Sequence, residues 1–340
     1  MARYDVAGIV AEPGQRVEGV LGEVSLANGV RVGVPVVIAN GAADGPTLVV
    51  TGSIHGEEIV GWGALVRVLQ SVSEGEIAGT LVAITNANPL ALQNSVYATP
   101  YDSVNLCGPL FWPANPHGTI TERMASFIAP ALHSASYYID LHSNSEPCVP
   151  MIMVFLDQCR DGEVKRETLR IADAFGFSIV NMPGHPEAHG DGSVFGSPSG
   201  YPAGVSLRHG IPAFQAELIG NPVLGDVELG RMAVMNVMRE IGMLDSPMEE
   251  LPTPRLEGDW VYYGSLINDV GGLLWVKHPA GTLLREGDVA AEITDVWGRT
   301  VEQIRMPVDG WCWAHAGGYY GRHTHAVHEG SMVGFVATRA

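Results

Sequence analysis

The sequence has few basic residues, and no apolar run is long enough to cross a membrane. Lys and Arg together number 19 against 37 Asp and Glu, which gives a formal net charge of −18 at pH 7. Because nucleic acids and anionic membranes bind positive protein surfaces, we expect neither as a partner. A membrane span needs about 18 consecutive apolar residues, and the first residues lack the basic and apolar segments of a signal peptide. We therefore expect a cytoplasmic protein.

Cysteines are also few. Cys107, Cys148, Cys159 and Cys312 show no C-x-x-C spacing, so we expect four reduced thiols. Hydrophobic residues make up 46% of the chain and charged residues only 16%, which predicts a folded protein with a large core.

The order of sequence patterns predicts an α/β fold. Between residues 46 and 245, apolar runs typical of strands alternate with stretches of helical periodicity, which indicates a mainly parallel mixed sheet with helices on both faces. Residues 1–45 predict short strands that belong to the same catalytic domain, 1–245. Residues 246–259 are rich in proline and acidic side chains and predict a linker. Short strands and glycine turns in 260–340 predict a small C-terminal all-β domain of barrel-sandwich type.

Two strand ends carry residues that can bind a metal. The run TLVV leads into G-S-I-H-G-E-E, where His55 and Glu58 are three residues apart at a strand-to-helix turn. The strand YYIDLHS ends near His142. Because open α/β sheets bind ligands at the carboxyl ends of their strands, these three side chains are expected to meet. Two histidines and one carboxylate, with a position left for water, make a catalytic zinc set of one ion per chain.

Two further acidic residues end apolar strands. Asp140, two residues before His142, either orients that histidine or caps a loop. Glu217 ends the run IPAFQAEL, where a buried carboxylate needs a partner or a function. It is either a general base that passes a proton from water to the leaving nitrogen, or one half of a salt bridge at the rim.

The motifs GSIHGEEIVGWGAL, NANPLA, IDLHS and AELIG resemble the succinylglutamate desuccinylase/aspartoacylase family of the zinc carboxypeptidase-like superfamily. The resemblance covers residues 30–245 and extends into the β domain. It implies a zinc ion bound by His55, Glu58 and His142, with Glu217 as general base and acid. It also implies hydrolysis of an N-acyl amide, and it allows a homo-oligomer.

One segment departs from the family pattern. Members of the family carry a pattern similar to N-P-x-A, followed by an arginine and then by D-x-x-D-L-N-R. In this sequence Tyr97 stands at the arginine position, and Cys107-Gly108 stand where Asn-Arg is expected. Arginine grips carboxylates through a bidentate fork that these residues cannot supply. Two alternatives follow. Either the substrate lacks a carboxylate at this point and Tyr97 donates a hydrogen bond to the oxyanion, or another arginine of the chain binds the substrate carboxylate.

The alternative arginines are Arg123 and Arg208. We expect both, together with Asn105, to be substrate-binding residues.

Other polar clusters are weaker signals. His185, His189 and Asp191 form either a second metal site or a polar surface loop. His323, His325 and His328 either chelate metal or end a solvated strand. The C-terminal domain is similar in pattern to lipoyl and biotinyl carrier domains, but the stretch that should hold the modified lysine reads Arg-Met-Pro at 305–307, so we expect no swinging arm.

Three functions remain open from the sequence. The first is a zinc-dependent deacylase or amidohydrolase that acts on a small N-acylated amino acid or related amide. The second is a zinc carboxypeptidase, although the arginine expected for a terminal carboxylate is missing. The third is a non-catalytic zinc- or ligand-binding homologue, which would have no need for the base Glu217.

Overall fold

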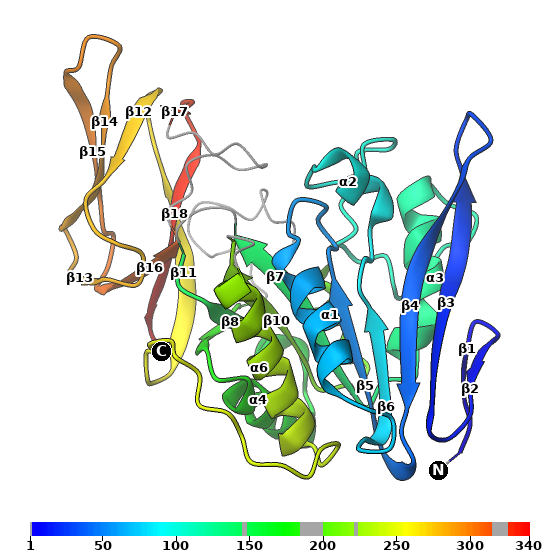
Figure 1. Cartoon of the computed structure of the whole chain (residues 1–340). Coiled ribbons are helices and arrows are strands. Elements are labelled where there is room, and N and C mark those ends of the chain that lie inside the picture. Colours follow the sequence, from blue (N-terminus) through cyan, green and yellow to red (C-terminus); the bar gives the residue numbers. More distant parts are fainter. Residues whose placement is uncertain (1, 145–147, 184–199, 221–223, 315–325) are drawn as a thin grey trace.

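The computed structural model describes residues 2–144, 148–183, 200–220, 224–314 and 326–340. Within them, a sheet of twelve strands runs through the whole molecule in the order β13-β16-β18-β11-β9-β8-β10-β7-β5-β6-β4-β3 (Figure 1). Its strands are β3 (Gln15–Ser25), β4 (Arg31–Asn40), β5 (Ala43–Gly52), β6 (Ala78–Ile84), β7 (Tyr137–Asn144), β8 (Met151–Val154), β9 (Ser178–Asn181), β10 (Ala213–Ile219), β11 (Trp260–Ile267), β13 (Leu283–Leu284), β16 (Gly310–Ala314) and β18 (Met332–Arg339).

Two smaller sheets, six α-helices and one short 3₁₀ helix, η1 (Leu156–Gln158), complete the described elements. The sheets pair β1 (Tyr4–Val6) with β2 (Ile9–Ala11), and order β15 (Thr300–Arg305), β14 (Val289–Thr294), β12 (Gly272–Val276) and β17 (Ala326–Val327). The helices are α1 (Val60–Ser71), α2 (Pro89–Asn94), α3 (Ile120–His133), α4 (Gly162–Phe175), α5 (Pro202–Arg208) and α6 (Leu224–Glu240).

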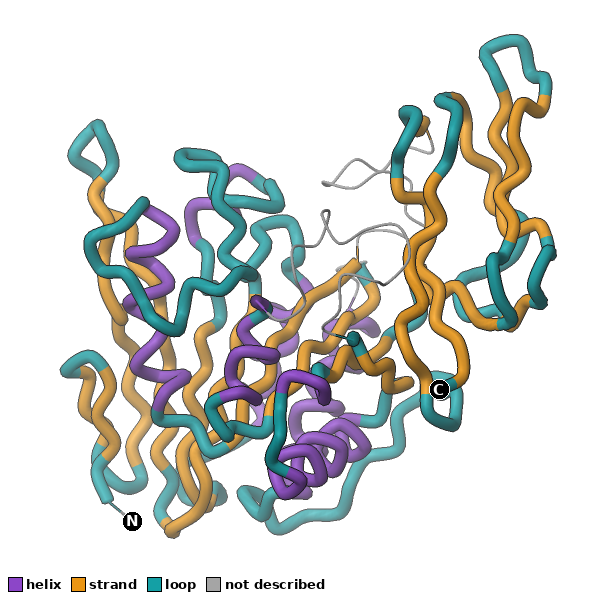
Figure 2. The backbone as a smooth tube through the Cα atoms, turned by 180° about the vertical axis from the view of Figure 1, so that it is seen from behind, coloured by secondary structure: helices purple, strands orange, loops and turns teal. Residues whose placement is uncertain are grey.

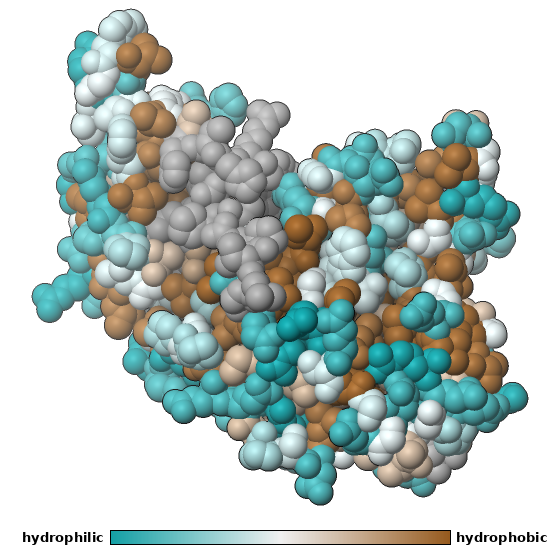
Figure 3. Space-filling view, viewed as in Figure 1, coloured by the Kyte–Doolittle hydropathy of each residue, from teal (hydrophilic) through white to brown (hydrophobic). Residues whose placement is uncertain are grey.

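Helices cover both faces of the sheet, as the sequence predicts. One core packs α1, α4 and α6 against one face, and a second core packs α3 and α5 against the other. Figure 1 shows α1, α4 and α6 in front of the sheet, and Figure 2 shows the molecule from behind. Hydrophobic and hydrophilic residues are interspersed over the face that Figure 3 shows, as is usual for a solvated surface.

The prediction of a mixed sheet is confirmed. Parallel pairs join β6 to β5, β5 to β7 and β7 to β10 at the centre, whereas β8 runs antiparallel to β10. β3 and β4 pair antiparallel because a short turn connects them. β11 and β18, which are distant in the sequence, also pair antiparallel.

The connection 88–118 begins with a short helix. Pro89–Asn94 forms α2, which is capped by the Asn88 side chain and has proline at its first position. The N-terminal segment has two long strands, β3 and β4, beside two short ones, because their antiparallel pairing extends over nine residue pairs.

The large sheet continues across the expected linker. After residues 246–259, β11 joins β9 in parallel through the pairs Trp260↔Val180 and Val261↔Asn181. The C-terminal strands also have a core of their own, and β12, β14 and β15 project away from the body (Figure 1). The domain boundaries stay a prediction.

Two expectations drawn from composition can be compared with the fold. All four cysteines are free thiols. None of the helices in the described part of the chain has the length and apolar character needed to cross a membrane.

Candidate functional site

The strand order brings the predicted site residues to neighbouring strands. His55 follows the end of β5, His142 lies near the end of β7, and Glu217 lies near the end of β10. In the parallel pairing of β7 with β10, Glu217 is directly opposite His142, and Gln215 is opposite Asp140. Because side chains alternate along a strand, all four project to the face that carries α3 and α5.

His55, Glu58 and His142 converge as predicted. The Glu58 carboxylate lies 2.8 Å from Nδ1 of His55 through Oε1 and 2.8 Å from Nδ1 of His142 through Oε2. The two Nδ1 atoms are 3.2 Å apart. Both imidazoles are buried, with 3% and 1% of their surface exposed, so the three ligand atoms face one another away from bulk water.

Each imidazole is held from its far side by an oxygen atom. His55 Nε2 lies 3.0 Å from Oδ1 of Asn105, and that oxygen also accepts a hydrogen bond from the Cys107 backbone amide at 2.8 Å. The amide donor identifies this atom of Asn105 as the oxygen, so His55 Nε2 carries the proton. His142 Nε2 lies 3.1 Å from Asp140 Oδ2. Both histidines therefore direct the lone pair of Nδ1 at the centre of the cluster.

The local charges favour a cation at this point. Burial acts to raise the pKa of Glu58, but the two histidines beside it outweigh burial and hold that pKa well below its usual range. Burial acts to lower the pKa of His142, but Asp140 and Glu58 outweigh it and raise that pKa well above its usual value. A positive charge is thus stabilised between the ligand atoms.

The cluster is of a size that fits a metal ion. In a tetrahedral site with metal–nitrogen bonds of about 2.0–2.1 Å, two ligand nitrogens lie about 3.3 Å apart. The two Nδ1 atoms are 3.2 Å apart, and each lies 2.8 Å from one of the two Glu58 carboxylate oxygens, so these separations are close to this value. His55, Glu58 and His142 could therefore hold a metal ion, and they form one of two such groups among the described residues.

The second group is Cys107, Asp140 and His142. The Cys107 sulfur lies 3.9 Å from His142 Nε2. Burial raises the pKa of Cys107 to about 11, which keeps it a neutral thiol. This group shares His142 with the first group but would use Nε2 of its ring in place of Nδ1.

The turn after β5 is shaped by a glycine. The Gly56 amide donates to the Val96 carbonyl at 2.9 Å, and a Cβ at Gly56 would lie 2.0 Å from the carbonyl carbon of Ala91. This close approach brings the end of α2 against the turn. Tyr97 then stacks on His55, with ring centroids 3.6 Å apart and planes 20° apart.

The end of the loop is tied to α3. The Asp102 carboxylate accepts hydrogen bonds from the Thr121 backbone amide at 2.9 Å and from the Thr121 hydroxyl at 2.8 Å. Thr119 and Glu122 form the expected capping box at the same helix end. Asn105, three residues after Asp102, is thereby fixed behind His55.

Glu217 is buried beside the cluster. Its side chain is 7% exposed, and its Oε1 accepts a hydrogen bond from Gln215 Nε2 at 2.8 Å. Burial raises the pKa of Glu217 to about 7; the charge of His142 acts to lower it and that of Glu58 to raise it. A carboxyl group with such a pKa can take up and release a proton near neutral pH.

The expected substrate-binding residues differ in position. Asn105 lies behind His55, as described. Arg123 is exposed on α3, where its Nε donates to the Gly118 carbonyl at 2.9 Å, and Arg208 is exposed at the end of α5, where it contacts Gln158. Neither arginine forms a described ion pair with the cluster, and Gly108 has no side chain to do so. Substrate contacts of these residues stay predictions.

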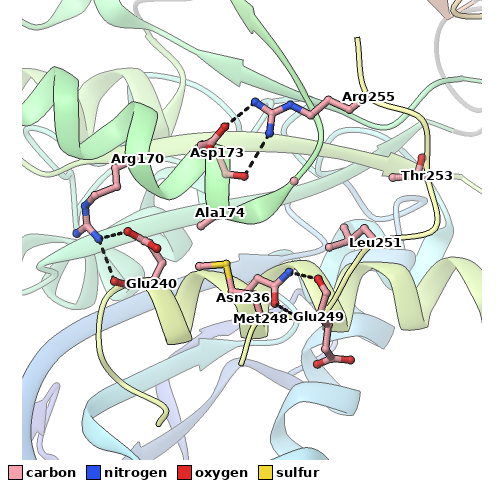
Figure 4. A pocket seen from close by; sticks show the side chains of 11 residues that line it. Arg170, Asp173, Ala174, Asn236, Glu240, Met248, Glu249, Leu251, Thr253 and Arg255 are labelled. Carbon is pink, nitrogen blue, oxygen red and sulfur yellow. Dashed lines mark hydrogen bonds and ion pairs between the residues drawn. The ribbon is translucent and has the colours of Figure 1, made fainter. Parts of the chain in front are cut away.

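A separate cavity of about 480 Å³ lies where residues 248–255 cross α4 and α6 (Figure 4). Its charged residues are paired with one another, as in Arg170–Glu240 and Arg255–Asp173, both at 2.7 Å. None of the residues that line it belongs to the metal cluster, and we assign it no role in the chemistry.

Some expectations fall outside the described residues. These are the loop with His185, His189 and Asp191, and the residues His323 and His325. His328 is described as an exposed residue at the end of β17.

Gln215 was not singled out from the sequence. The spacing of Gln215 could have identified it. Gln215 stands two residues before Glu217, just as Asp140 stands two residues before His142.

Comparison with known proteins identifies the family of this chain. Residues 44–238, more than half of the chain, match the model of the succinylglutamate desuccinylase/aspartoacylase catalytic domain. A segment of 150 residues is 28% identical to N-alpha-acetyl-L-2,4-diaminobutyric acid deacetylase of Halomonas elongata; it is 44% of this chain and 43% of that protein, so the match spans less than half of the curated relative.

Solved structures show the same fold over nearly the whole chain. A succinylglutamate desuccinylase/aspartoacylase from Rhodobacter sphaeroides superposes with a TM-score of 0.80 at 22% identity, covering 96% of each chain. The product-bound ectoine utilization protein EutE (DoeB) of Ruegeria pomeroyi superposes with a TM-score of 0.78 at 19% identity, covering 95% of each chain. Because the family model matches more than half of the chain, including the strands that carry the candidate metal ligands, the chain belongs to the succinylglutamate desuccinylase/aspartoacylase family.

Proposed function

We propose that this protein is a zinc-dependent amidohydrolase that cleaves the amide bond of a small N-acylated amino acid or related amide. The Halomonas relative is named as a deacetylase, and the matching family model is named for a desuccinylase and an aspartoacylase. The observation that carries the proposal is the convergence of His55, Glu58 and His142 beside the buried carboxylate of Glu217.

The donor set supports zinc as the metal. Two imidazole nitrogens and one carboxylate oxygen are the protein ligands typical of a catalytic zinc site. The outer nitrogen of His55 is hydrogen-bonded to Asn105 Oδ1, and the outer nitrogen of His142 lies 3.1 Å from the Asp140 carboxylate. Zinc in this site would polarise the substrate carbonyl and lower the pKa of the attacking water.

Glu217 moves the proton. As a carboxylate it takes a proton from the water that attacks the amide carbon, and as a carboxylic acid it gives that proton to the departing nitrogen. The products are a carboxylic acid and a free amine. A pKa of about 7 suits both halves of the cycle, because neither protonation state is costly near neutral pH.

Tyr97 supports the developing oxyanion. Its ring is fixed by stacking on His55, which limits the positions that the phenolic hydroxyl can reach. A single hydroxyl donor stabilises a developing negative charge on the carbonyl oxygen but does not grip a carboxylate as arginine does.

The charges around the site favour a substrate with an uncharged acyl group. Arg123 and Arg208 are engaged elsewhere, and the described ion pairs include none between an arginine or lysine and the metal cluster. An acyl group that carries its own carboxylate would meet the carboxylates of Glu58 and Glu217, with no arginine or lysine of the described residues paired to the cluster. The Halomonas relative is named for removing an acetyl group, which carries no charge.

The test is release of free amine from N-acetyl amino acids, N-succinyl amino acids, neutral amides and peptides. Wild type, Glu217→Ala and the exposed-carboxylate control Glu163→Ala would be compared with their zinc content measured. We expect wild type and control to hydrolyse N-acetyl substrates faster than N-succinyl ones, and Glu217→Ala to lose activity while it keeps zinc.

Each other outcome rejects part of the proposal. A wild type that binds no zinc would reject the metal site. Release of C-terminal residues from peptides, without amine release from acyl amino acids, would indicate a carboxypeptidase. Bound zinc without hydrolysis of any substrate would indicate a binding protein.

A further inference from the structure

Strands β7 and β10 present two matching rows of side chains on the face that carries α3 and α5. At the end of the strands, His142 lies opposite Glu217; one step deeper, Asp140 lies opposite Gln215. All four are buried. On β7 the deeper residue holds the outer one, since Asp140 lies 3.1 Å from Nε2 of His142.

The same relation holds on β10. Gln215 Nε2 donates to Oε1 of Glu217 at 2.8 Å, and the second contact of this nitrogen is the Met153 sulfur at 3.8 Å. On the other side of the amide, the Cys107 sulfur lies 4.0 Å from Gln215 Oε1. A thiol can donate a hydrogen bond and a carboxylate can only accept one, so these neighbours fix which end of the amide is nitrogen.

The position of the Glu217 carboxylate depends on this contact. A carboxylate at the end of two flexible torsions can turn about its last bond, and a donor that holds one oxygen restricts that turn. Gln215 is itself only 4% exposed and is packed between Met153 and Cys107, so it cannot move with the carboxylate. A rigid donor of this kind places the carboxylate plane before substrate arrives.

We propose that Gln215 is the positioning residue of the general base: its amide holds one oxygen of Glu217 so that the carboxylate faces the attacking water. This inference rests on the proposed function, since it assigns Gln215 a role only if Glu217 moves the proton. Gln215 does not itself touch the reacting atoms. It acts on Glu217 as Asp140 acts on His142.

The test is a double-mutant cycle on kcat and KM. Gln215→Met keeps the side-chain length and apolar packing but removes the donor. Misplacement of a reacting group by about 1 Å can cost on the order of 100-fold in rate, so we expect kcat to fall about 10- to 100-fold. KM should change less than about threefold because substrate binding is not touched. Zinc content should stay at the wild-type level.

In the Glu217→Ala background the same substitution should change the residual kcat less than about twofold, since the group that it positions is gone. The matched control is Gln70→Met, which removes an exposed side-chain amide on α1 that accepts a hydrogen bond from Arg67. It should leave kcat and KM unchanged.

Thermal unfolding would accompany the kinetics. If Gln215→Met fails to fold, Gln215→Asn serves instead. It keeps a polar amide but is one methylene shorter, which draws the donor back from Glu217, so kcat should again fall with zinc retained.

Three results would overturn the inference. They are an unchanged kcat in a folded Gln215→Met, a loss confined to KM or zinc content, or an equal loss in the presence and absence of Glu217. Failure of the proposed function is separate, because it would appear as full activity in Glu217→Ala itself.

Discussion

Substitution of Asp140 by asparagine tests whether the metal ligands are held from behind. Asp140 is fully buried; its Oδ1 accepts a hydrogen bond from the Thr51 hydroxyl at 2.7 Å, and its Oδ2 faces His142 Nε2 at 3.1 Å. An asparagine has only one oxygen, so it can accept from His142 only by turning its NH₂ group toward Thr51. The negative charge that makes His142 a stronger ligand is lost in either orientation.

The expected magnitude follows from that loss. Removal of a carboxylate that supports a metal-bound histidine typically costs 10- to 100-fold in metal affinity, or about 1.4–2.8 kcal/mol. We expect Asp140→Asn to raise the zinc Kd by this factor, measured by competition with a chromophoric chelator. The rise in thermal midpoint that zinc gives the wild type should shrink accordingly.

The control for this experiment is Thr51→Val, which removes a hydroxyl next to Asp140 but keeps the charge. Its zinc Kd should rise less than about 10-fold, because the supporting carboxylate remains. A zinc Kd for Asp140→Asn equal to that of wild type would refute the reasoning, provided that His142→Ala loses zinc in the same assay.

Three further predictions follow from other parts of the site. The base Glu217 must be deprotonated, and burial raises its pKa to about 7, so kcat/KM should rise with pH up to an inflection near pH 7. A bound cation would lower the pKa of Glu217 and move that inflection to lower pH. A flat profile between pH 5 and 8 would contradict the role of Glu217 as general base. Tyr97→Phe should lower kcat about 10- to 100-fold with zinc retained, since it removes one oxyanion donor and keeps the stacked ring, and an unchanged kcat would exclude the hydroxyl from the reaction. Gly56→Ala should lower the free energy of unfolding by about 1–3 kcal/mol, because its Cβ would clash with the Ala91 backbone. Gly75→Ala, where a Cβ meets open space, should change it by less than about 0.5 kcal/mol, and equal effects in chemical denaturation would reject the account.

The metal cluster could be predicted from the sequence because it depends on local pattern and on one general rule. His55, Glu58 and His142 each stand at or just beyond the end of an apolar strand, and parallel strands bring such ends together. The helices could be predicted for a similar reason. The span 162–175 is marked by a capping aspartate at its start and a left-handed glycine at its end, both of which the structure shows.

The supporting residues could not be predicted because their partners are distant in sequence. Asn105 was expected to contact the substrate. In the structure its side-chain oxygen is hydrogen-bonded to His55, which is fifty residues earlier in the sequence. Gln215 and Cys107 are brought together only when the loop before α3 packs against β10. The helix α2 was missed because its six residues are too few to show a helical period within a proline- and asparagine-rich segment.

The junction between β9 and β11 has a consequence for the order of folding. β9 is complete by Asn181, but its outer neighbour begins only at Trp260, so the outer edge of β9 stays open while the intervening chain is synthesised. Open strand edges pair readily with other chains. A protein that ends at Leu244 should therefore aggregate, which light scattering would detect. The C-terminal strands thus cover the open edge of the catalytic sheet. They do so late in synthesis, when Trp260 contacts Trp311 and Arg339.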